Sequence, residues 1–97
     1  MLSSIPLSLN EINAQDRDKE ILRAGIIAEL DAVNLYEQMA SVAKSEAIRT
    51  CLLDIAREEK THVGEFQALL LKLDAEQVDE LEHGKNEVDE QMSEEKL

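Results

Sequence analysis

The chain has 97 residues, of which 22 are acidic and 10 are basic, so its formal net charge is −12. Such an excess of acids repels polyanions and argues against nucleic-acid binding, whereas it attracts cations. A chain of this length forms one small domain with a modest core, which favours help from oligomerisation. The absence of Trp and the low counts of Gly and Pro, beside many Ala, Leu, Glu and Lys, predict an all-helical fold.

The chain shows no sign of export or of membrane insertion. Residues 1–12 contain neither a basic segment nor a long apolar run, so we expect no signal peptide. No stretch approaches the roughly 18 apolar residues of a transmembrane helix. The single Cys51 cannot form an intrachain disulfide, which fits a reducing compartment, and we expect it to be a small core residue. The sequence therefore predicts a cytoplasmic protein.

The first helix is predicted to follow an irregular N-terminal arm. Residues 1–15, with Pro6 and scattered Ser and Asn, show no sustained period. Asp16 and Asp18 then supply N-cap and first-turn acids for a helix over 16–43. Spacings of three and four place one apolar face on this helix. Its members are Leu22, Gly25, Ile26, Val33, Tyr36 and Ala40.

Glu29 lies in the middle of that apolar face. A carboxylate that stays charged and alone in apolar surroundings costs about several kcal/mol. Glu29 must therefore be paired, hydrogen-bonded, metal-bound or protonated.

A second helix is predicted over 46–73, after a polar break at 44–46 that is short enough to join antiparallel helices. Glu59 and His62 both lie on its apolar face, because side chains at i and i+3 share one side of a helix. A carboxylate with an imidazole suits a transition metal better than a hard alkaline-earth ion. The other members of this face are Ile48, Leu52, Ile55, Phe66, Leu69 and Leu73.

Both helices carry a second apolar strip, and the rest of the chain is strongly acidic. Two apolar faces on a two-helix hairpin imply contacts between subunits. Residues 74–97 contain ten acids and two lysines. There we expect a short helix over 75–83, a break at Gly84 and a loosely ordered acidic tail. The second strips consist of Ile27 and Leu35 on the first helix and Leu53, Gly64, Ala68 and Leu71 on the second.

Glu29 and the motif Glu59-Lys60-Thr61-His62 supply half of a known ligand set. Ferritin-like di-iron bundles take one Glu from each of two helices and a Glu-x-x-His from each of the other two. Two copies of this chain around a two-fold axis would complete a four-helix bundle with two metals. Residues 26–40 and 56–66 carry both halves of the motif and resemble the encapsulated ferritins, and the similarity extends over about residues 16–90.

The resemblance implies which residues form the site. Glu29, Glu59 and His62 would be iron ligands from each of two subunits, with two irons at each dimer interface. Tyr36 would line the centre, and Asp31 would lie near the route by which the metal enters. Without the resemblance, a lone aromatic on a core face is explained by packing and a helix acid such as Asp31 by solvation.

The resemblance also implies an activity and an assembly. Encapsulated ferritins are ferroxidases, which oxidise Fe(II) to Fe(III) with dioxygen. Their two-helix subunits dimerise, the dimers form a ring, typically a decamer, and a surrounding encapsulin shell stores the iron. Family members often end in a targeting peptide of small and apolar residues, whereas this chain ends in Met92-Ser93-Glu94-Glu95-Lys96-Leu97. The resemblance thus supports iron chemistry more directly than encapsulation.

Other interpretations stay open at this point. The chain could be a non-catalytic metal-stapled or purely helical oligomer, or a protein-interaction module that uses its acidic surface. It could also be a di-iron peroxidase or oxygenase-like protein related to rubrerythrin, although one cysteine excludes a rubredoxin-type module within the chain. His83, beside Glu80 and Glu82, fits a surface metal site or a solvated histidine. Glu58 and Glu65 fit secondary cation sites or ordinary helix-surface pairs.

Overall fold

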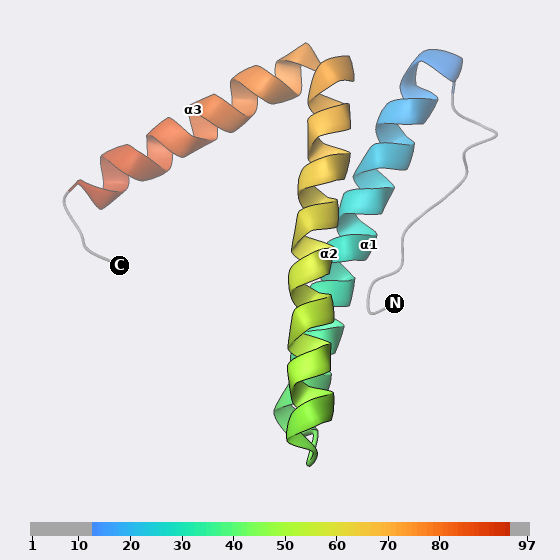
Figure 1. The fold of residues 1–97 in the computed structure, drawn as a ribbon. Coiled ribbons are helices and arrows are strands. Elements are labelled where there is room, and N and C mark those ends of the chain that lie inside the picture. The colour runs from blue at the N-terminus through green and yellow to red at the C-terminus, as the bar shows by residue number, and fades with distance from the viewer. Residues whose placement is uncertain (1–12, 94–97) are drawn as a thin grey trace.

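The computed structural model describes residues 13–93, which form three helices and no strand. Helices α1 (Ala14–Val42) and α2 (Glu46–Leu73) form an antiparallel hairpin. Helix α3 (Ala75–Met92) starts where α2 ends and turns away from the long axis of the hairpin (Figure 1). The predicted all-helical hairpin with a further C-terminal helix is therefore confirmed. Most of the predicted N-terminal arm lies outside the described residues.

The first helix begins with a cap that differs from the predicted one. Asn13 is the N-cap, and its side-chain oxygen accepts a hydrogen bond of 3.0 Å from the backbone N–H of Asp16. The Asn13 amide in turn donates to the Asp16 carboxylate at 3.0 Å. Such a reciprocal pair, three residues apart, satisfies a backbone donor that the first turn leaves free. The helix consequently starts at Ala14, two residues before the expected start at Asp16.

The second helix starts directly after a short polar connection. Ser45 is its N-cap, and the hydroxyl accepts a hydrogen bond of 3.3 Å from the N–H of Ile48. Glu46 adds an acid to the first turn, where the helix dipole favours negative charge. The connection between the helices is therefore only a few residues long, and the two helices pack side by side.

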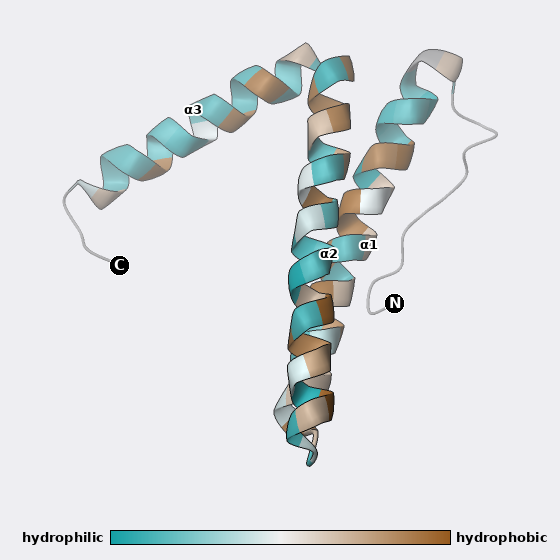
Figure 2. Cartoon of the chain, viewed as in Figure 1, coloured by the Kyte–Doolittle hydropathy of each residue, from teal (hydrophilic) through white to brown (hydrophobic). Residues whose placement is uncertain are grey.

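The contact between α1 and α2 buries few residues. The buried apolar residues are Val33 and Leu70, with 8% and 4% of their surface exposed, and Ala40 and Ala56, with 2% each. The radius of gyration is 17.0 Å, against roughly 12 Å for a compact domain of this length. Apolar residues recur along both helices of the hairpin (Figure 2), and several large ones are exposed. The single chain thus leaves much of its apolar surface without a partner.

Two predictions about local structure are wrong. Cys51 is exposed and not a core residue, because the hairpin covers only one side of each helix. Helix α3 does not break at Gly84 but continues through it to Met92. A glycine costs only about 1 kcal/mol in a helix interior, and the helix formers around it offset that cost. Lys85 also forms an ion pair with Asp89 at 2.6 Å, four residues on, which supports the second half of α3.

No helix within residues 13–93 is both long enough and apolar enough to span a membrane.

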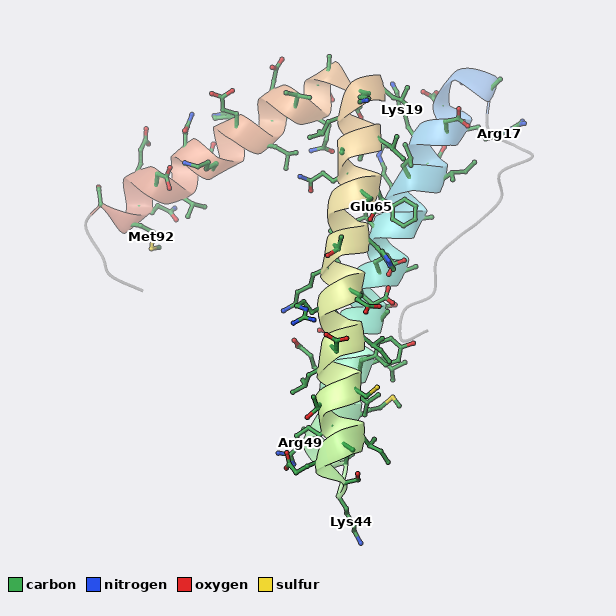
Figure 3. The ribbon with its side chains drawn as sticks, viewed as in Figure 1. Arg17, Lys19, Lys44, Arg49, Glu65 and Met92 are labelled. Atoms are coloured by element: carbon green, nitrogen blue, oxygen red, sulfur yellow. The ribbon has the colours of Figure 1, made fainter. Side chains whose placement is uncertain are left out.

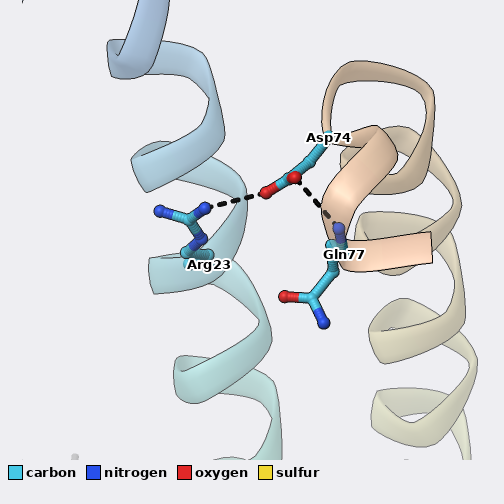
Figure 4. A network of polar contacts seen from close by, with 3 residues as sticks. All are labelled: Arg23, Asp74 and Gln77. Atoms are coloured by element: carbon cyan, nitrogen blue, oxygen red, sulfur yellow. Dashed lines mark hydrogen bonds and ion pairs between the residues drawn. The ribbon is translucent and has the colours of Figure 1, made fainter. Parts of the chain in front are cut away.

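Asp74 joins all three helices (Figure 4). Its backbone N–H donates to the carbonyl of Leu70 at 3.0 Å and ends α2. Its carboxylate accepts a hydrogen bond of 3.0 Å from the N–H of Gln77, which caps α3, and one of 2.9 Å from Arg23 of α1. The hydrogen bond from Gln77 and then that from Arg23 lower the pKa of Asp74 below its ordinary value of 3.8. The charged form of Asp74 therefore stabilises the junction.

We expect Asp74→Asn to lower the free energy of unfolding at neutral pH. Asn still accepts at an N-cap, but it loses the charge that Arg23 pairs with. Because the native pKa lies below the unfolded value, the charged Asp74 contributes fully above about pH 4 and loses its contribution as the pH falls through the native pKa. Urea unfolding at fixed protein concentration should show the variant approaching wild type as the solution is acidified. Asp79→Asn removes the same charge from α3 and serves as the control. A difference in unfolding free energy between Asp74→Asn and wild type that stays constant down to pH 2 would contradict the prediction.

Candidate metal centre

Three side chains converge near the middle of the hairpin. Glu29 comes from α1, and Glu59 and His62 come from α2. One potential ligand atom from each lies within 4.8 Å of the others. Within residues 13–93, no other group of three His, Cys, Asp or Glu side chains comes as close together. The structure thus brings together the three residues that the sequence predicted as metal ligands.

The distances between these atoms are short. His62 Nδ1 lies 3.2 Å from a carboxylate oxygen of Glu59 and 3.5 Å from Oε2 of Glu29. The two carboxylate side chains are 20% and 18% exposed, whereas that of His62 is 43% exposed. Oε2 of Glu29 is itself buried and has no hydrogen-bond partner. A neutral imidazole carries at most one proton on Nδ1, so it satisfies one of the two carboxylates and leaves the other without a donor.

The arrangement fits a transition-metal ion. Nitrogen and oxygen ligands lie about 2.0–2.2 Å from such an ion, which places two ligands of one ion roughly 3.0–3.5 Å apart. The distances of 3.2 and 3.5 Å around His62 Nδ1 agree with this spacing. A cation would also supply the positive charge that the buried oxygen of Glu29 lacks. Three ligands would leave coordination positions of such an ion open.

Tyr36 and Asp31, the other residues predicted for the site, lie on different sides of α1. Tyr36 is half-buried and follows Glu29 by seven residues, a spacing that returns to the same side of a helix. Asp31 follows Glu29 by two residues, so it projects from roughly the opposite side. It is not part of the converging group. Only Tyr36 is therefore placed to face the same space as Glu29.

The candidate secondary sites do not converge on a cation position. Glu58 and Glu65 are exposed and lie outside the converging group. His83 is exposed and contacts Glu80 at 3.5 Å through Nδ1 and Glu87 at 3.2 Å through Nε2. Because each ring nitrogen of His83 faces a different carboxylate, the cluster has the geometry of helix-surface ion pairs.

The side of α2 that carries His62 also carries exposed apolar side chains, two or more turns away from it. Ile48, Leu69 and Leu73 lie on the same side of α2 as His62, and they are 57%, 51% and 49% exposed. The sequence predicted these residues on the apolar face, and α1 does not cover them. Figure 3 shows side chains projecting from both helices of the hairpin into open space. A groove on this side is lined by Asp18, Ile21, Leu22, Leu69, Lys72 and Leu73.

Comparisons with known proteins agree with the fold. The sequence model of the family described as Rubrerythrin matches residues 20–96. A "Ferritin-like-encapsulin shell fusion protein" from Pyrococcus furiosus is 58% identical over 92 residues, which are 93% of this chain and 27% of that protein. The "Encapsulin nanocompartment cargo protein EncC" from Myxococcus xanthus is 38% identical over 56 residues, 58% of this chain and 43% of that protein. The chain thus spans about a quarter of the first relative and under half of the second.

A solved structure is similar over nearly the whole chain. The crystal structure of the encapsulated ferritin domain from Pyrococcus furiosus matches with a TM-score of 0.79 and 55% sequence identity. The match covers 93% of this chain and 94% of that one. The likeness therefore includes α1 and α2, which carry the converging side chains.

Proposed function

The chain belongs to the rubrerythrin family of ferritin-like proteins, and on this premise we propose that it is a ferroxidase. Its substrate is Fe(II), which dioxygen oxidises to Fe(III) at a di-iron centre between two copies of the chain. The observation that carries the proposal is the convergence of Glu29, Glu59 and His62 around a buried carboxylate oxygen that has no partner.

The ligands suit a site that binds Fe(II) and favours its oxidation. Each copy brings two carboxylates and one imidazole, so a dimer brings four negative charges to two irons. Anionic oxygen ligands stabilise the higher charge of Fe(III) more than that of Fe(II). The partial burial of Glu29 and Glu59 lowers the local dielectric and strengthens this effect. A pair of adjacent irons can give dioxygen two electrons. We place Tyr36 at the edge of this centre. We place Asp31, which projects from the other side of α1, near the outer part of the route by which iron enters.

The second copy supplies what one chain lacks. The exposed apolar residues on the same side of α2 as His62 need a cover, and a two-fold partner would cover them with the same residues of its own. The exposed strip on the opposite side of the hairpin would then join dimers into a ring. The names of the two relatives link them to encapsulins. We accordingly propose that this chain acts inside an encapsulin shell, which retains the iron that it oxidises.

A stopped-flow experiment tests the proposal. Anaerobic Fe(II) is added to the protein and air is then admitted. We expect Fe(III) absorbance to rise faster than in protein-free buffer, with the fast phase saturating near two irons per dimer. A non-catalytic oligomer stapled by metal would bind Fe(II) and change its assembly state, yet it would oxidise iron at the background rate. Light scattering with and without Fe(II) detects such assembly.

A further inference from the structure

Gly25 of α1 lies directly against the ring of Phe66 on α2. A Cβ built at Gly25 would stand 3.0 Å from Cε1 of Phe66 and 3.1 Å from both Cδ1 and Cζ. Ordinary contacts of a Cβ atom begin at 3.4 Å. The aromatic ring therefore occupies the space that any side chain at position 25 would need.

This contact lies one helical turn from the converging ligands. Gly25 precedes Glu29 by four residues, and Phe66 follows His62 by four. Because the helices are antiparallel, both steps lead in the same direction along the hairpin, by about 5–6 Å. The Gly25–Phe66 contact is thus the next contact between α1 and α2 after that of Glu29 with His62. It limits how closely the two helices approach at that end of the metal centre.

From this geometry we infer that Gly25 is a positioning residue for the metal centre. It lets the Phe66 ring lie on the backbone of α1 and so holds Glu29 within reach of an ion bound by Glu59 and His62. Binding constellations tolerate displacements of about 0.5 Å. A methyl group at Gly25 requires a shift of a few tenths of an ångström, which uses up much of that tolerance. The inference rests on the proposed function only in requiring that the three side chains hold a metal.

Helix propensity alone does not explain this residue. Alanine is the better helix former, because glycine loses more backbone entropy on folding. Gly25 sits deep inside α1, where local preference disfavours glycine. The close contact with the Phe66 ring explains why a glycine occupies this position. Gly64 and Gly84 have nothing within 4 Å of the same built Cβ position, so alanine fits at both without any shift.

Cobalt titration compares Gly25→Ala with Gly84→Ala, a control on α3 whose Cβ position is equally open. Co(II) binding is followed by its visible absorption, and thermal unfolding of each metal-free protein is measured beside it. We expect Gly25→Ala to weaken Co(II) binding about tenfold or more and to alter the spectrum of the bound ion. Gly84→Ala should match wild type in both respects. A merely structural role would lower the unfolding temperature and leave the spectrum of bound Co(II) unchanged.

A second variant keeps the test decisive if Gly25→Ala folds poorly. Phe66→Leu in the Gly25→Ala background removes Cε1 and Cζ, two of the three ring atoms that the new methyl group meets, so Co(II) affinity should recover in the folded double variant. Wild-type affinity and spectrum in Gly25→Ala, or no recovery in a folded double variant, would overturn the positioning role. Failure of the wild type itself to bind Co(II) would instead overturn the proposed metal centre.

Discussion

Glu29→Gln should remove most of the iron oxidation while leaving the hairpin folded. Glutamine keeps the shape of the side chain but replaces an anionic ligand by a weak neutral one. A dimer would lose two of the four negative charges around its two irons. Loss of a residue that only supports a ligand already costs about 10–100-fold in metal affinity or activity. For a direct ligand we therefore expect a fall of at least about 100-fold in the fast phase of Fe(III) formation.

The same substitution should stabilise the metal-free protein. Oε2 of Glu29 is buried without a hydrogen-bond donor, although it lies 3.5 Å from Nδ1 of His62. The amide of Gln can donate to Glu59 and carries no charge, so the cost of an unsatisfied buried acceptor falls. Thermal unfolding without metal should thus shift upward as activity is lost, the trade-off typical of binding sites.

The control is Glu37→Gln on the same helix. Glu37 is exposed and pairs with Lys60 at 3.6 Å, a surface ion pair with little effect on stability. This change removes an equal charge, so it should leave the oxidation rate within about twofold, as expected for screened surface charge. An unchanged rate in Glu29→Gln, or an equal loss in Glu37→Gln, would contradict the assignment of Glu29 as a ligand.

The converging residues were predictable because they break a pattern. Glu29 interrupts an apolar face, and Glu59 and His62 repeat the interruption on the next helix. Helical periodicity then suffices to show that all three point toward the partner helix or beside it. The distances between them and the unpartnered oxygen of Glu29 are visible only in the packed hairpin. Periodicity in the sequence does not fix how closely two helices approach.

Other features depend on a balance between opposing free-energy terms, which a sequence pattern does not give. The sequence shows that Gly84 lowers helix propensity, but not that neighbouring helix formers and the Lys85–Asp89 pair outweigh it. The spacing of apolar residues shows that Leu69 belongs to an apolar face of α2. It does not show whether α1 or another subunit covers that residue. In the sequence, the contact between Gly25 and Phe66 is indicated only by a glycine deep inside a long predicted helix.

Leu69→Asp should separate the proposed dimer and remove its metal centre together. Leu69 follows His62 by seven residues on the same side of α2, and 51% of its surface is exposed in the single chain. A two-fold interface would bury this residue in both copies, so the substitution acts twice. Each buried carboxylate costs about several kcal/mol, which weakens dimerisation by on the order of 1,000-fold or more. Light scattering should then report monomers, and each monomer would hold only half of the ligands.

Leu53→Asp is the matched control because Leu53 lies on the opposite side of the same helix. It is nine residues before His62, a half-turn away at 100° per residue, and it is 47% exposed. The control adds the same charge to an equally exposed leucine, so it should leave the dimer and its iron oxidation intact even where it opens a contact between dimers. Circular dichroism should show the helix content of the wild type in both variants, since neither side chain is buried within one chain. A Leu69→Asp protein that remains dimeric and oxidises iron at the wild-type rate would place the two-fold axis elsewhere on the hairpin.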